Sequence, residues 1–250
     1  MMDNEFPIPI PDRLPIKIDP CPIAEAILEI RFITSESWPT LPGLLFAKIR
    51  ERYPEQKDLP LAQLPEEIRR REPAFTYQPL IQFHSRDFLI QFGPRVIALA
   101  TKSKEYPGWA ALEEEMTWLV SELQQTGFVS EGERLGVRYI NFFSLDIFEK
   151  LELEVSTGEK RLAGELSVTS VLTMPPLTSR LLVANSVILG TGDSARHGSV
   201  LDVDVWLGSL DFDLFQNGLA KFGEAHHFEK QIFFGLLKPD FLATLNPVYE

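Results

Sequence analysis

The chain has 250 residues, of which 44% are hydrophobic and 24% charged, and this composition is typical of a folded globular protein. Its 36 acidic and 24 basic residues give a net charge of −12, which disfavours binding to nucleic-acid phosphates. No stretch approaches the roughly 20 apolar residues of a membrane span, and the single Cys21 excludes an intramolecular disulfide. We therefore expect a cytoplasmic protein with neither a nucleic-acid nor a membrane partner.

The first 22 residues contain six of the 19 prolines. Pro7, Pro9 and Pro11 alternate with apolar residues, which predicts an extended N-terminal arm over residues 1–22. Such an arm would pack on its own domain, on a sister subunit of a homo-oligomer, or on nothing.

Residues 23–128 form the first predicted half. Strands show apolar residues at alternate positions, whereas the long helix shows an apolar stripe with Pro107 before it and Gly127 at its end. Acids begin and cations end the short helix expected within 54–73, a pattern that the helix dipole favours. The strands are predicted at 24–33, 76–83, 88–92 and 95–101, and the main helices at 43–53 and 109–126.

Residues 129–250 form the second predicted half. A short helical piece is expected at 146–151 and a long C-terminal helix at 212–237. Gly218 and Gly223 weaken that helix, so we expect a kink or a break there. The remaining predicted elements are strands at 135–145, 165–173, 180–189 and 200–207 and a turn at 239–245.

The two halves show signs of an internal repeat. Residues 29–33 and 136–140 share the pattern x-[IV]-R-[FY]-I, and the offset between their arginines is 138 − 31 = 107. The same offset carries the helix at 109–126 to 216–233, inside the C-terminal helix. The sequence therefore predicts an α+β fold of two related β-α-β-β-β-α halves, in which a curved antiparallel sheet grips the long helices.

Two motifs carry a resemblance to a known family. Residues 22–32, Pro-Ile-Ala-Glu-Ala-Ile-Leu-Glu-Ile-Arg-Phe, resemble the opening of a sporadically distributed family of bacterial and archaeal proteins of about this length. Residues 134–141, Arg-Leu-Gly-Val-Arg-Tyr-Ile-Asn, look like its second motif, and residues 201–204 look like a third. The resemblance implies a prokaryotic, cytoplasmic protein of a single family. It implies no activity, cofactor or site residues.

The motifs of common enzyme classes are absent from the sequence: it contains no P-loop, no G-x-G-x-x-G, no H-E-x-x-H and no G-x-S-x-G. The glycines of residues 190–198 are explained more simply by a hairpin than by a phosphate-binding loop. His226 and His227 are adjacent and would point about 100° apart on a helix, so they cannot both bind one metal ion from it. We expect no cofactor and no metal.

Charged residues on predicted strands are the candidates for ligand binding. Their ordinary explanation is a solvated sheet face or cross-strand ion pairs. The functional explanation is a partly covered sheet face where carboxylates and guanidinium groups converge on a polar ligand. The candidate residues are Glu25, Glu29, Arg31, Arg134, Arg138, Asp202 and Asp204.

These observations favour a non-enzymatic binding or assembly module for a protein or a small polar ligand, with no catalytic residue assigned. The alternative is an enzyme that uses Glu25 or Glu29 as acid/base with an arginine partner. A deep pocket with a desolvated glutamate would favour the enzyme, whereas an open face with paired charges would favour the module.

Overall fold

The structure, a computed structural model, describes residues 6–102, 105–190, 192 and 195–249. The strands are β1 Ile23–Ile33, β2 Glu55–Asp58, β3 Ile81–His84, β4 Phe88–Gly93, β5 Val96–Thr101, β6 Glu131–Phe143, β7 Ser156–Thr157, β8 Lys160–Arg161, β9 Ser167–Met174, β10 Leu177–Leu189 and β11 Arg196–Gly208. The α-helices are α1 Leu41–Ile49, α2 Glu66–Arg71, α3 Trp109–Thr126, α4 Gly218–Leu236 and α5 Pro239–Thr244. The fold is therefore α+β, as the sequence predicts.

Nine of the strands form one antiparallel sheet within the described residues, in the order β2-β3-β4-β5-β1-β6-β11-β10-β9. Strands β7 and β8 form a separate two-stranded hairpin. None of the described helices is both long enough and apolar enough to cross a membrane.

The chain divides into two compact units that do not follow the predicted boundary between 128 and 129. Unit 1 contains the residues up to Ala24, Arg138–Val205 and the residues from Ala225 onward, whereas unit 2 contains Glu25–Val137 and Trp206–Glu224. Strands β1, β6 and β11 and helix α4 each have residues in both units.

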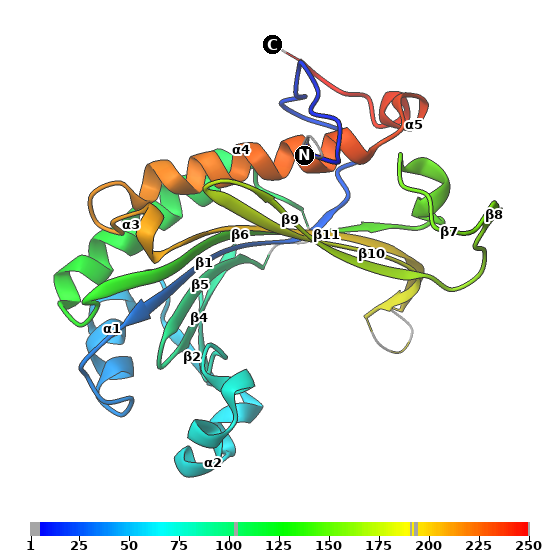
Figure 1. The fold of residues 1–250 in the computed structure, drawn as a ribbon. Helices are drawn as coiled ribbons and strands as arrows, with labels where there is room; N and C mark the ends of the chain where they lie inside the picture. The colour runs from blue at the N-terminus through cyan, green and yellow to red at the C-terminus, as the bar shows by residue number, and fades with distance from the viewer. Residues whose placement is uncertain (1–5, 103–104, 191, 193–194, 250) are drawn as a thin grey trace. The chain divides into compact units, whose positions relative to one another are not determined.

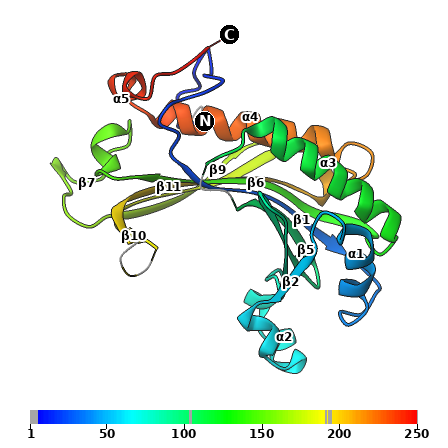
Figure 2. The same cartoon turned by 180° about the vertical axis from the view of Figure 1, so that it is seen from behind.

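The core of unit 2 lies between the strands and helices α1 and α3, which lie side by side in both views of the fold (Figures 1 and 2). Alternate residues of β1 are buried, because their side chains point to this core, and the aromatic residues Phe32, Phe92 and Phe128 pack with ring centroids 5.7–6.4 Å apart. Tyr53 stacks on Trp118 of α3 at 5.8 Å. The apolar stripe of α3 is buried, as its helical spacing predicts.

In unit 1 the N-terminal arm packs against the C-terminal part of the same chain. The ring of Phe6 lies 5.2 Å from Phe228 of α4, and Ile8 is buried. Backbone hydrogen bonds join Ile16 and Lys17 to Val248 at 2.8–2.9 Å. The described part of the predicted arm, residues 6–22, therefore packs on its own domain, and residues 1–5 lie outside the described residues.

Several element bounds differ from the sequence-based expectation. Helix α1 begins earlier, with Pro42 in its first turn, and ends at Ile49. The strand expected over 76–83 is limited to β3, because a 3₁₀ helix at Pro73–Phe75 and a turn precede it. Strand β2 was not predicted, since its sequence Glu-Gln-Lys-Asp has no apolar alternation and it forms only by pairing with β3.

The long C-terminal helix also differs from its predicted range. Asp213 accepts hydrogen bonds from the backbone N–H groups of Phe215 and Gln216, which builds a turn before the helix. Helix α4 therefore begins at Gly218, one of the two glycines where a kink or a break was expected, and it continues through Gly223 without a break.

Candidate ligand-binding site

Strand β1 has one buried face and one polar face. Ala26, Leu28, Ile30 and Phe32 are buried, whereas Glu25, Glu29 and Arg31 are half-buried on the other side. The alternation in the sequence predicted this division because successive side chains of a strand point to opposite faces. The polar face of β1 in unit 2 is where the candidate site begins.

The carboxylate of Glu29 holds two arginines of this face. Its Oε1 accepts a hydrogen bond from Nε of Arg31 at 2.8 Å and another from Nη1 of Arg134 on β6. The side chain of Arg134 is 12% exposed, so most of its charge is shielded from water. Three of the seven predicted residues thus come together in unit 2, with one carboxylate shared by two guanidinium groups.

A second group of polar side chains continues this face. Both carboxylate oxygens of Glu133 accept from the hydroxyl of Tyr77 at 3.4 Å, and Oε1 also accepts from Nη2 of Arg95. The guanidinium groups of Arg31 and Arg95 lie over the ring of Tyr77, with Cζ 4.5 and 5.4 Å from its centroid. Tyr77 therefore connects Arg31 of β1 and Arg95 of the turn between β4 and β5 to a glutamate of β6.

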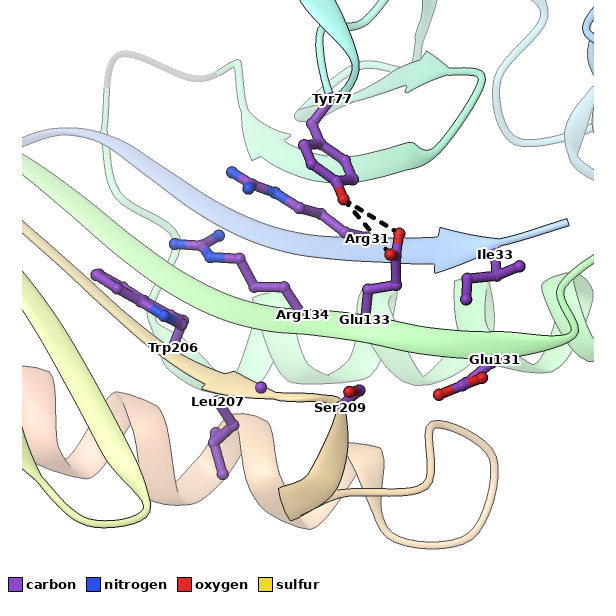
Figure 3. A pocket seen from close by; sticks show the side chains of 10 residues that line it. Arg31, Ile33, Tyr77, Glu131, Glu133, Arg134, Trp206, Leu207 and Ser209 are labelled. Carbon is purple, nitrogen blue, oxygen red and sulfur yellow. Dashed lines mark hydrogen bonds between the residues drawn. The ribbon is translucent and has the colours of Figure 1, made fainter. Parts of the chain in front are cut away.

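Four of these side chains, Arg31, Tyr77, Glu133 and Arg134, line a cavity of about 320 Å³. That volume lies at the small end of the range for ligand pockets, about 300–1,000 Å³. Figure 3 shows Arg31 and Arg134 on the left of the cavity beside Trp206, and Glu133 and Glu131 on its right. The other lining residues are Ile33, Tyr77, Leu207, Gly208 and Ser209.

The position of Arg134 depends on a glycine of the second motif. A Cβ added at Gly136 would lie 2.6 Å from Nη1 and 3.0 Å from Cζ of Arg134. The guanidinium group of Arg134 also lies over the ring of Trp206, 4.9 Å from its centroid. The absence of a side chain at Gly136 therefore leaves the space in which Arg134 reaches Glu29 and Trp206.

The candidate residues of unit 1 form a separate ion pair. Arg138 donates from Nε and Nη2 to the two carboxylate oxygens of Asp202, at 2.8 and 2.6 Å. Asp202 is buried, whereas the side chain of Arg138 is 34% exposed, so this two-bond pair is shielded from water on the side of the carboxylate. Arg138 of β6 thus pairs with a carboxylate of the neighbouring strand β11, whereas Arg31 pairs with Glu29 of its own strand. Glu25 and Asp204 are half-buried, and neither lines the cavity of unit 2.

Helix α4 brings two further titratable groups into the interior of unit 1. Burial lowers the pKa of His226 to about 3, and its Nδ1 lies 3.1 Å from the hydroxyl of Tyr139. Burial also raises the pKa of Glu229 well above its ordinary value, while the charge of Lys230 opposes this rise and that of Asp202 adds to it. Sequence reasoning missed Glu229, because one acid in a helix gives no sign of which face it occupies.

The sequence also missed most polar and aromatic residues of the cavity: Tyr77, Glu131, Glu133, Trp206 and Ser209 on its wall, and Arg95 beside Tyr77. Tyr77 was assigned to a strand, although it lies in the turn before β3. Glu133 precedes the predicted start of its strand, and β6 begins at Glu131. The alternation of β1 and the arginine spacing of β6 were the only signals that pointed to this face.

Neither metal-binding clusters nor known relatives identify the site. Within 6–102, 105–190, 192 and 195–249, no three His, Cys, Asp or Glu side chains are grouped as a metal ion would require. No model of a known protein family matches the chain, and no curated protein matches it. The resemblance drawn from the sequence motifs therefore stays a prediction.

Proposed function

We propose that the chain is a non-enzymatic binding module that holds a small polar ligand in the cavity of unit 2. The observation that carries this proposal is that the guanidinium group of Arg31 is bonded to the described part of the protein through only one of its nitrogen atoms. Its Nε is bonded to Glu29 and its plane lies over Tyr77, but its two terminal amino groups make no hydrogen bond to any described residue. These donors line the cavity, where an acceptor of a ligand can meet them.

Two carboxylates of this face already have protein partners. Oε1 of Glu29 accepts from two arginines, and Glu133 on the cavity wall accepts from Arg95 and Tyr77. A general base is activated by burial or by a partner that raises its pKa, whereas Glu29 and Glu133 are held by cations and the remaining carboxylate of the cavity, Glu131, is exposed. The enzyme alternative, with Glu25 or Glu29 as acid/base, is therefore less well supported. Glu229 is desolvated, but it lies on α4 and not on the cavity wall.

The remaining expectations about this protein belong to the same proposal. We infer that it is a cytoplasmic, prokaryotic protein of the family that its motifs resemble, and that its two halves arose by duplication. Duplication is supported by strand order, which is β3-β4-β5-β1 in the first half and β9-β10-β11-β6 in the second, and by the long helix that closes each half. A protein partner in place of a small ligand is less well supported, since the cavity has the volume of a metabolite.

Thermal melts with the small-molecule fraction of a native-host extract test the proposed function. A ligand at a hundred times its Kd stabilises a protein by about 2.7 kcal/mol, which corresponds to a rise in Tm of roughly 5–10 °C for a chain of this size. We expect this rise for the wild type and not for Arg31→Met. The matched control is Arg86→Met, because the side chain of Arg86 is 94% exposed in a turn away from the cavity. An equal rise in all three proteins contradicts the proposal.

A further inference from the structure

The cavity of unit 2 offers groups of opposite charge on its two sides. Figure 3 shows the guanidinium groups of Arg31 and Arg134 on one side and the carboxylates of Glu133 and Glu131 on the other. The ring of Tyr77 lies between the arginines and Glu133, whereas Ile33 lies on the side of the glutamates. A ligand in this space therefore meets hydrogen-bond donors at one end and acceptors at the other.

On the basic side, Arg31 has hydrogen-bond donors that the described residues do not use. The ring of Tyr77 lies 4.5 Å from its Cζ, and Glu29 holds its Nε, so the plane of the guanidinium group is fixed from two directions. Its two terminal amino groups have no partner among the described residues. A planar guanidinium edge presented in this way matches the two oxygens of a carboxylate.

On the acidic side, Glu131 has the free acceptors. Glu133 is bonded to Tyr77 and Arg95, whereas the carboxylate of Glu131 makes no hydrogen bond or ion pair with any described residue. Glu131 is exposed at the start of β6, and the hydroxyl of Ser209 lines the same part of the cavity. An ammonium group, with three donors, fits a carboxylate and a hydroxyl of this kind.

The two sides together restrict the charge of the ligand. An anion without a cationic group would meet the repulsion of Glu131 and Glu133, and a cation without an anionic group would meet that of Arg31 and Arg134. A cavity of about 320 Å³ also limits the ligand to the size of a small metabolite.

We propose that the cavity of unit 2 binds a small zwitterion of the amino-acid class, with its carboxylate on Arg31 and its ammonium group toward Glu131. This inference rests on the proposed function, because it names the chemistry of the ligand for the same site. It assigns Arg31 and Glu131 as the residues that recognise the two charged groups.

Titration calorimetry with free L-amino acids and their blocked derivatives tests this assignment. The common L-amino acids are first compared by thermal shift, and the one that stabilises most is then titrated beside its N-acetyl and carboxamide forms. We expect each blocked form to bind the wild type at least about tenfold more weakly, since each loses one charge-assisted contact.

Two variants connect each loss to its residue. In Arg31→Met the free amino acid and its carboxamide are expected to bind equally weakly, and in Glu131→Gln the free amino acid and its N-acetyl form are expected to do so. Arg86→Met and Glu114→Gln, which change exposed side chains outside the cavity, are the matched controls and should retain wild-type selectivity.

The outcomes separate this inference from the proposed function. The zwitterion assignment is wrong if blocked and free forms bind the wild type equally. It is also wrong if no amino acid binds while Arg31→Met abolishes the binding of a host metabolite. In both cases the proposed binding module stands. If neither amino acids nor host metabolites bind the wild type, both proposals fail.

Discussion

Arg138 and Asp202 form an ion pair in unit 1 in which the carboxylate is almost completely buried. Removal of one member of a buried pair leaves the other charge unpaired, which costs about 3–5 kcal/mol. We therefore expect Arg138→Met to lower the free energy of unfolding by this amount in urea titrations. Arg31→Met should cost about 1 kcal/mol or less, since its partner Glu29 is 22% exposed and keeps the bond from Arg134.

The double variant Arg138→Met/Asp202→Asn serves as the control for this prediction. It removes the stranded charge, so it should recover part of the stability that the single variant loses. Equal losses for Arg31→Met and Arg138→Met would show that burial does not distinguish the two pairs.

Glu229 should make the stability of the protein fall as the pH rises. Its folded pKa is raised by burial, so the native state binds more protons than the unfolded state above the ordinary glutamate pKa of about 4.3. We compare the free energy of unfolding of Glu229→Gln with that of the wild type. The difference in favour of the variant should be smallest below about pH 4, and it should increase as the pH rises toward the raised pKa of Glu229. His226, whose pKa is shifted down, contributes the opposite slope but cancels in this difference.

Urea unfolding of wild type and Glu229→Gln at several pH values measures this effect. Glu114→Gln on the exposed face of α3 is the control, and its difference from the wild type should stay close to zero. A constant difference between Glu229→Gln and the wild type across the pH range would be inconsistent with a buried, titrating carboxyl group.

Sequence patterns predicted some residues of the candidate site and missed others. Alternation along β1 identified Glu29 and Arg31, because a strand with one apolar face must present its polar residues on the other. Tyr77 and Arg95 could not be found in this way. They come from two turns, one before β3 and one between β4 and β5, and only the folded chain brings them to Glu133.

At the scale of elements, two glycines of α4 allow a matched test of how the N-terminal arm is held. A Cβ at Gly235 would collide with the carbonyl oxygen of Pro9, whereas a Cβ at Gly223 would meet no atom within 4 Å. Alanine favours a helix over glycine by about 1 kcal/mol, so Gly223→Ala should stabilise the protein by up to that amount. Gly235→Ala should instead destabilise it by about 1–3 kcal/mol, because the arm must move.

Limited trypsin digestion provides a direct view of the arm. Cleavage after Arg13 and Lys17 should be faster in Gly235→Ala than in the wild type and unchanged in Gly223→Ala. If Gly235→Ala is as stable and as resistant as Gly223→Ala, the arm does not pack on α4 as described.

Elements with local signals were predicted closely, and those that depend on distant contacts were not. Helix α3 has its predicted bounds because its start, its apolar stripe and its terminal Gly127 all lie within its own sequence. Strand β2 has no such signal and exists through its pairing with β3. The start of α4 depends on side-chain bonds of Asp213, which compete with helix formation before Gly218.

At the scale of the whole molecule, the net charge of −12 argues against nucleic-acid binding. The one dense run of cations, at the end of α2, follows two acids of the same helix, and Arg70 pairs with Glu66 at 2.5 Å. We expect no binding of random duplex DNA or RNA below micromolar concentrations at physiological salt in fluorescence anisotropy. A tight complex that weakens as salt increases would refute this.

If the cavity of unit 2 holds a small polar ligand through Arg31, that ligand should be purified together with the protein. Mass spectrometry of the small molecules released by denaturing protein that has been purified from the native host measures this. We expect a compound that is present with the wild type and with Arg86→Met but lost with Arg31→Met, although all three proteins are folded. A compound retained equally by Arg31→Met, or no bound compound in the wild type, would contradict this expectation.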